Sequence, residues 1–121
     1  MRVVAPRNRE PALQWADDFW ADLTRQVDWY RDEASPEVAE RFVDAVEATL
    51  NVLVEQPGLG RARFRNWPEL EGIRSFRLRK PFHRFLIFYR FAGSTLYAER
   101  LIYGGRDLPG LLLKSPYAER P

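Results

Sequence analysis

The stretch Gly72–Asp107, GIRSFRLRKPFHRFLIFYRFAGSTLYAERLIYGGRD, decides the fold. We expect three consecutive strands joined by two short turns, because short runs of β-branched and aromatic residues alternate with turn residues. Apolar and basic residues alternate along the first strand: Phe76, Arg77, Leu78 and Arg79, before Lys80-Pro81 ends it. Since successive side chains of a strand point to opposite faces, this strand presents arginines on one face and apolar groups on the other.

The second and third strands carry apolar residues on both faces. In the second strand one face is predicted to hold His83, Phe85, Ile87, Tyr89 and Phe91, and the other Arg84, Leu86, Phe88 and Arg90. This pattern is typical of a central strand, and Phe85, Ile87 and Tyr89 are expected to face the helices. After the turn Ala92-Gly93-Ser94, the third strand runs from Thr95 to Tyr103. It is predicted to place Leu96, Ala98 and Ile102 on one face and Tyr97 and Leu101 on the other.

The first half of the chain predicts a short strand followed by two helices. Residues 12–15 favour the strand, and Asp17 or Asp18 is expected to cap the first helix. Ser35 should cap the second helix, with Pro36 at its first position, where the missing N–H costs nothing. The link between the helices is short, so they should form an antiparallel hairpin whose apolar stripes cover the sheet.

The resulting prediction is an α+β fold, in which an antiparallel helix hairpin packs on a small, mainly antiparallel sheet of three to four strands. The 121 residues fit one domain, expected at 12–113, with a flexible lead-in over 1–11 and a flexible tail over 114–121. Cysteine is absent, which excludes disulfides and thiolate chemistry. The start of the chain shows no apolar signal core, so we expect a cytoplasmic protein.

Charge is divided unevenly along the chain. Residues 1–59 contain 6 basic and 12 acidic residues, a net charge of −6, whereas residues 60–121 contain 13 basic and 5 acidic residues, a net charge of +8. The acidic side chains of the first half are interpreted as solvated helix surface. The basic half is a candidate for binding an acidic partner.

Most conventional catalytic motifs are missing. His83 is the only histidine, no metal-binding spacing occurs, and neither GxGxxG nor GxxxxGK[ST] is present. We therefore expect no metal and no cofactor. Trp67, in the loop between the second helix and the sheet, is interpreted as an anchor either for the core or for a partner.

The order of these segments resembles the ParE branch of the ParE/RelE superfamily, the toxins of bacterial type II toxin–antitoxin pairs. The residues that carry the resemblance are Trp67-x-x-Leu70-x-Gly72-Ile73-Arg74, Phe82-His83-x-Phe85-Leu86-Ile87-Phe88-Tyr89-Arg90 and Glu99-Arg100-Leu101-Ile102-Tyr103-Gly104-Gly105-Arg106-Asp107. The match covers about residues 12–112. One departure is Tyr103, where many relatives carry a histidine.

The resemblance implies one of two activities. RelE-type members cleave messenger RNA in the ribosome, and Arg77, Arg79 and Arg106 match their phosphate-binding cations. Leu86 and Leu112, however, replace a central arginine and the late catalytic tyrosine, which favours the ParE type. ParE-type members are described as inhibiting DNA gyrase by protein contact.

Three hypotheses remain for this sequence: a ParE-like gyrase inhibitor, a RelE-like endoribonuclease acting on ribosomal mRNA, or a non-toxic module that only binds its antitoxin. Each implies a cognate antitoxin as partner in a hetero-oligomer. An exposed sheet edge with arginines is able to accept an acidic segment of such a partner. The residues expected to bind the target or the antitoxin are Arg74, Arg77, Arg79, Arg106 and Trp67.

Overall fold

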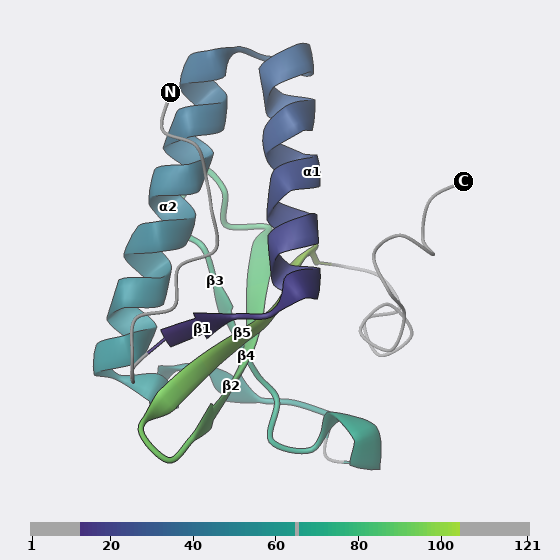
Figure 1. The fold of residues 1–121 in the computed structure, drawn as a ribbon, viewed down its shortest axis with the longest axis vertical. Coiled ribbons are helices and arrows are strands. Elements are labelled where there is room, and N and C mark those ends of the chain that lie inside the picture. The colour runs from purple at the N-terminus through teal and green to yellow at the C-terminus, as the bar shows by residue number, and fades with distance from the viewer. Residues whose placement is uncertain (1–12, 65, 105–121) are drawn as a thin grey trace.

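A helix hairpin packs on a mixed sheet in the computed structural model, which describes residues 13–64 and 66–104 (Figure 1). The elements are β1 (Leu13–Trp15), α1 (Asp17–Glu33), α2 (Pro36–Glu55), β2 (Arg61–Ala62), β3 (Arg74–Arg77), β4 (Phe85–Ala92) and β5 (Thr95–Tyr103), with short 3₁₀ helices at Pro57–Leu59 and Pro68–Leu70. The predicted lead-in and tail lie outside the described residues, as do Arg106 and Leu112.

The two helices lie side by side as the predicted antiparallel hairpin (Figure 1). The Ser35 side chain accepts a hydrogen bond of 3.1 Å from the backbone N–H of Val38, and Pro36 opens α2, as predicted. The predicted cap of α1 is wrong, because the capping residue is Ala16 and no side chain bonds there. Asp17 and Asp18 instead lie in the first turn of α1, where the helix dipole favours negative charge.

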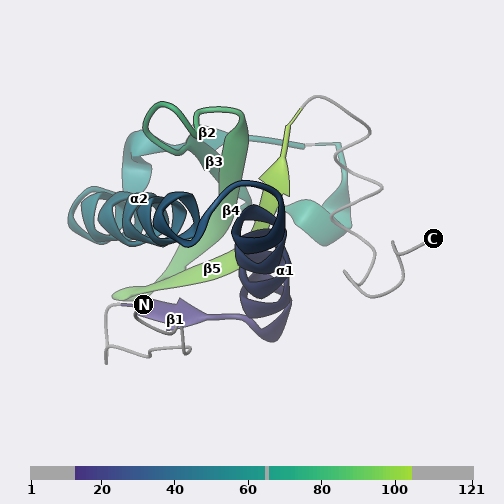
Figure 2. The same ribbon diagram turned by 90° about the horizontal axis from the view of Figure 1, so that it is seen from above.

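The sheet has the strand order β1-β5-β4-β3-β2 within the described residues. β1 runs parallel to β5, and the other neighbouring strands are antiparallel. β1 and β2 lie at opposite ends of the sheet (Figure 2). The α+β prediction is thus confirmed, with one strand more than expected: β2 formed in a segment that was predicted to be loop.

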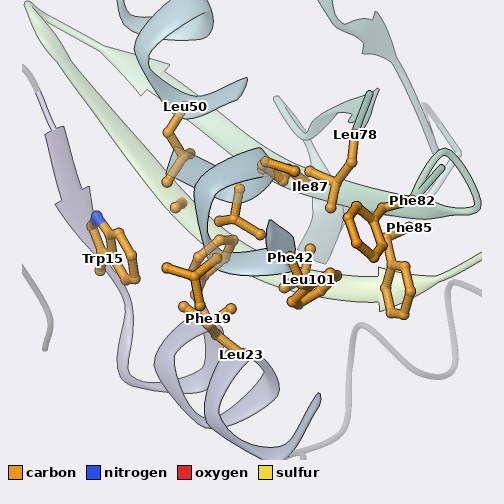
Figure 3. Close-up of a cluster of buried hydrophobic side chains, with 14 of the residues drawn as sticks. Trp15, Phe19, Leu23, Phe42, Leu50, Leu78, Phe82, Phe85, Ile87 and Leu101 are labelled. Atoms are coloured by element: carbon orange, nitrogen blue, oxygen red, sulfur yellow. The ribbon is translucent and has the colours of Figure 1, made fainter. Parts of the chain in front are cut away.

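The main core lies between the helix hairpin and one face of the sheet (Figure 3). Phe85, Ile87 and Tyr89 of β4 belong to it, as predicted. The helices contribute Phe19 and Phe42, both fully buried. Burying such side chains stabilises a fold by roughly 1.5–3 kcal/mol each, so this helix-facing surface is the main source of stability.

The opposite face of the sheet, here called the outer face, carries a second apolar cluster. Its buried members are Leu70, Ile73, Phe88 and Ile102, with Phe64 and Leu86 packed against them. The loop between β2 and β3 supplies three of these side chains and so covers part of the outer face. Apolar residues on both sides of β4 confirm that it is a central strand.

A bulge in β5 overturns part of the predicted face assignment. Tyr89 pairs with Ala98 but Phe88 pairs with Arg100, which leaves Glu99 as an extra residue in β5. The alternation shifts by one residue at this point. As a result Leu101 joins the helix-facing core and Ile102 the outer cluster, the reverse of the prediction.

The boundaries of β3 and β4 also differ from the prediction. β3 ends at Arg77 rather than at Lys80-Pro81, and β4 begins at Phe85 rather than at His83. The chain turns between them, with the backbone N–H of Leu78 donating to the carbonyl of Phe85 at 3.0 Å. Arg79 therefore lies in a turn, outside the strand that was expected to contain it.

A buried ion pair joins α1 to β5. The Asp22 carboxylate accepts hydrogen bonds from Arg100 Nε at 2.7 Å, from Arg100 Nη2 at 3.0 Å and from the Leu101 backbone N–H at 2.9 Å. Burial raises the pKa of Asp22, while the Arg100 guanidinium opposes that rise. Asp22 is an exception to the interpretation of helix carboxylates as solvated, because only 3% of the residue is exposed.

We predict that Asp22→Ala lowers the free energy of unfolding by about 3–5 kcal/mol, because it leaves a buried guanidinium without its partner. Urea denaturation followed by circular dichroism measures this change. Asp28→Ala is the matched control, since Asp28 pairs with Arg31 at 3.2 Å on the exposed face of the same helix. That control should change stability by less than about 1 kcal/mol. Equal effects of the two substitutions would contradict the prediction.

Candidate functional site

Arg74, one of the predicted binding residues, holds the turn that follows α2. Its Nη1 donates to the carbonyl of Gly60 at 2.8 Å, from a half-buried position. The Tyr89 hydroxyl lies beside it, accepts from the Gly60 backbone N–H at 2.9 Å and donates to the Pro57 carbonyl at 2.6 Å. Burial raises the pKa of Tyr89. Arg74 and Tyr89 thus stabilise this turn, and a binding role for Arg74 stays a prediction.

Arg77 and Arg79 are both exposed, but only Arg77 belongs to the sheet. Arg77 lies opposite Leu86 on the outer face, and its Nη1 donates to the carbonyl of His83 at 3.1 Å. Trp67 is 42% exposed beside the 3₁₀ helix Pro68–Leu70. Arg106 lies outside the described residues.

The structure brings Arg77 together with two arginines, Arg61 and Arg63, that are not among the predicted site residues. Arg61 on β2 pairs with Ser75 on β3, and Arg77 follows Ser75 by two residues on the same strand. Paired residues and residues two apart share one face of a sheet, so both arginines point to the outer face. Arg63 follows, and its Nη1 donates to the Ser75 hydroxyl at 3.0 Å. Partial burial lowers the pKa of Arg63, and the positive charges of Arg61 and Arg77 lower it further. We call Arg61, Arg63 and Arg77 the arginine cluster.

Arg90, which the predictions did not include among the site residues, fastens the loop over the outer face. Its guanidinium donates to the backbone carbonyl of Glu71, and Nη2 donates to that of Glu69 at 3.2 Å. Its Nε lies 3.7 Å from the Glu99 carboxylate. Only the folded loop reveals this role, because the acceptors are backbone atoms about twenty residues away in sequence.

A groove of about 670 Å³ runs between α1 and the last part of β5. Its lining includes Arg25, Trp29 and Tyr103, and the two aromatic residues are 55% and 45% exposed. β1 covers the edge of β5 only from Leu96 to Ala98, so the edge beyond that point borders the groove. We call this feature the α1–β5 groove.

Residues 13–64 and 66–104 show no candidate metal site and no candidate membrane span. In that part of the chain, no group of three or more His, Cys, Asp or Glu side chains is arranged to hold a metal ion. No helix there has the length and apolar character needed to cross a membrane.

Comparison with known families decides the classification. Residues 13–108 match the family described as "ParE toxin of type II toxin-antitoxin system, parDE". The chain belongs to this family. Among solved structures, the chromosomal ParDE toxin–antitoxin system from P. aeruginosa is similar, with a TM-score of 0.63 and 23% sequence identity. The alignment covers 78% of this chain and 96% of that chain. No curated protein matches.

Membership of the ParE family confirms the resemblance drawn from the sequence motifs, and the P. aeruginosa structure supports the fold. A ParE-family chain is the toxin component of a type II pair, which implies an antitoxin partner. The binding roles of Arg74, Arg77, Arg79, Arg106 and Trp67 stay predictions.

Gly60 provides a test of the turn that Arg74 and Tyr89 hold. A Cβ at this position would lie 2.4 Å from the Tyr89 hydroxyl and 2.9 Å from the Ser75 carbonyl oxygen, closer than atoms pack. Gly60→Ala should therefore lower the free energy of unfolding by about 1–3 kcal/mol, as overpacking does. Chemical denaturation monitored by circular dichroism measures the loss.

Gly58→Ala is the control for that substitution, because a Cβ at Gly58 meets nothing within 4 Å. It should leave stability within about 0.5 kcal/mol of the parent. An equally small change in the free energy of unfolding for Gly60→Ala and Gly58→Ala would contradict the close approach of Tyr89 to the turn.

Proposed function

We propose that this ParE-family toxin acts in the cytoplasm, where it inhibits DNA gyrase by protein contact until a cognate antitoxin neutralises it. Family membership supports the toxin role. The observation that favours gyrase over messenger RNA as the target is the packing of Leu86. Leu86 packs half-buried against the outer cluster, at the position where RelE-type ribonucleases are expected to present a central cation.

The neighbouring polar groups also favour binding over RNA cleavage. General acid/base catalysis needs a titratable group that reaches the substrate. The Tyr89 hydroxyl is engaged on both sides, by the Gly60 N–H and by the Pro57 carbonyl. Arg74 is tied to the same turn, whereas Arg77 and Arg79 are exposed cations. Exposed cations, together with a Tyr89 hydroxyl that already has two partners, suit a binding surface.

A supercoiling assay with purified gyrase and relaxed plasmid tests the proposal. The toxin should block supercoiling and cause cleaved DNA–gyrase complexes to accumulate, and toxin mixed beforehand with its antitoxin should do neither. Normal supercoiling at saturating toxin would refute gyrase as the target.

Transcript mapping after induction separates the remaining alternatives. A RelE-like endoribonuclease would cut ribosome-bound mRNA, and Arg77→Ala, Arg79→Ala and Arg106→Ala would each reduce the cutting. A non-toxic antitoxin-binding module would leave both transcripts and growth unchanged when expressed alone. The gyrase proposal requires intact transcripts together with arrested growth.

The α1–β5 groove is the surface that we propose for the antitoxin. It combines an open stretch of strand edge with exposed aromatic rings and Arg25, a combination suited to an extended or helical acidic segment. Aromatic and arginine side chains dominate the binding energy of many protein interfaces. Trp29 and Tyr103 are the anchors expected here.

We predict that Trp29→Ala and Tyr103→Ala each weaken antitoxin binding by roughly tenfold or more, which corresponds to an anchor worth at least about 1.4 kcal/mol. Isothermal titration calorimetry with the purified antitoxin measures the affinity. Phe91→Ala is the control, since this ring is 42% exposed on β4 but does not line the groove. Unchanged affinity in both groove variants would place the antitoxin elsewhere.

A further inference from the structure

The arginine cluster concentrates positive charge at the β2 end of the sheet. Arg61 and Arg77 are exposed on the outer face, and Arg63 lies half-buried close enough for both to lower its pKa. The β2–β3 pairing fixes their spacing, because Arg61 stands opposite Ser75 and Arg77 lies two residues further along β3. Three like charges held together in this way raise the local positive potential.

Among the described residues, the neighbours of these arginines do not neutralise their charges. Arg63 bonds to the Ser75 hydroxyl and Arg77 to the His83 carbonyl, both uncharged acceptors. Within residues 13–64 and 66–104, the ion pairs formed by carboxylates involve Arg25, Arg31, Arg90 and Arg100, none of them in the cluster. The cluster therefore gains most from an anionic ligand that supplies the missing countercharge.

Phe64, an aromatic residue in contact with the cluster, bears on which nucleic acid suits it. The Phe64 ring already stacks on Phe88, with centroids 6.2 Å apart, and the Arg63 guanidinium lies 5.1 Å from its centre. Unpaired bases are bound largely by stacking on free aromatic faces. Phe64 is engaged with protein groups instead, whereas the phosphates of a duplex need only cations.

We propose that the arginine cluster binds the phosphate backbone of duplex DNA. Forked guanidiniums are well matched to phosphate oxygens, and such contacts carry no base sequence preference. This inference goes beyond gyrase inhibition, because the contact needs no other protein. A toxin bound at the cluster would be held on the same DNA that a supercoiling enzyme handles.

Fluorescence anisotropy of the purified full-length chain with a labelled 30-base-pair duplex tests the proposal. Three phosphate contacts predict that the binding constant falls roughly 40-fold between 50 and 200 mM salt, since each contact contributes about 0.9 to the logarithmic slope. Arg61→Gln combined with Arg77→Gln should leave one contact and a fall of roughly fourfold. Circular dichroism verifies that the variant is folded.

The matched control is Arg31→Gln combined with Arg41→Gln, which removes the same charge from exposed positions on α1 and α2. It should keep the steep salt dependence of the parent. Three outcomes would overturn the proposal: no saturable binding at 50 mM salt, equal losses in the cluster and control variants, or tighter binding of single-stranded RNA of the same length.

The two proposals fail separately. A cluster variant that loses DNA binding but still blocks supercoiling leaves the gyrase proposal intact and assigns the DNA contact to a second surface. A parent chain that binds duplex DNA through the cluster but leaves supercoiling normal supports the inference and refutes gyrase as the target.

Discussion

The buried contact of Asp22 with Arg100 and the Leu101 backbone is the constraint on which the rest of the structure depends. β1 pairs with β5 only as far as Ala98, so the edge of β5 loses its strand neighbour just where the strand must continue into the core. The Asp22 carboxylate takes the place of that neighbour by accepting the Leu101 N–H. The Glu99 bulge makes this possible, because it shifts the alternation of β5 and turns Leu101 toward the helices.

This arrangement separates the two faces of one small sheet. The helix-facing side is occupied by core side chains, so it has little left to offer a partner. The outer face is only partly covered by the loop that Arg90 fastens, and it carries the arginine cluster. The uneven distribution of charge along the chain thus corresponds to a separation in space. Acidic residues concentrate on the helices, and the basic half supplies β2 to β5 and the outer loop.

The two candidate binding surfaces lie on opposite sides of β4 in the strand order. The α1–β5 groove borders β5, whereas the arginine cluster lies on β2 and β3. A segment bound in the groove therefore need not cover the cluster, and one toxin has room for a protein partner and a phosphate backbone. Membership of the ParE family accounts for the protein partner. The guanidiniums of the arginine cluster, which form no carboxylate ion pair within residues 13–64 and 66–104, give the reason to look for the second ligand.

The sequence by itself determined the helix hairpin, the central position of β4 and the family, because each rests on local patterns: the Ser35-Pro36 helix start, apolar residues on both faces of β4, and the order of short motifs. Only the tertiary structure decided how the site is built. Three features depend on contacts between residues distant in sequence: the Glu99 bulge, the Asp22–Arg100 pair and the grouping of Arg61, Arg63 and Arg77. The alternation of apolar and polar residues along a strand predicts neither an inserted residue nor a partner 78 positions away. Arg74 shows the same limit: the sequence predicted only a binding role, which stays a prediction, whereas the fold adds a hydrogen bond from its guanidinium to the Gly60 carbonyl.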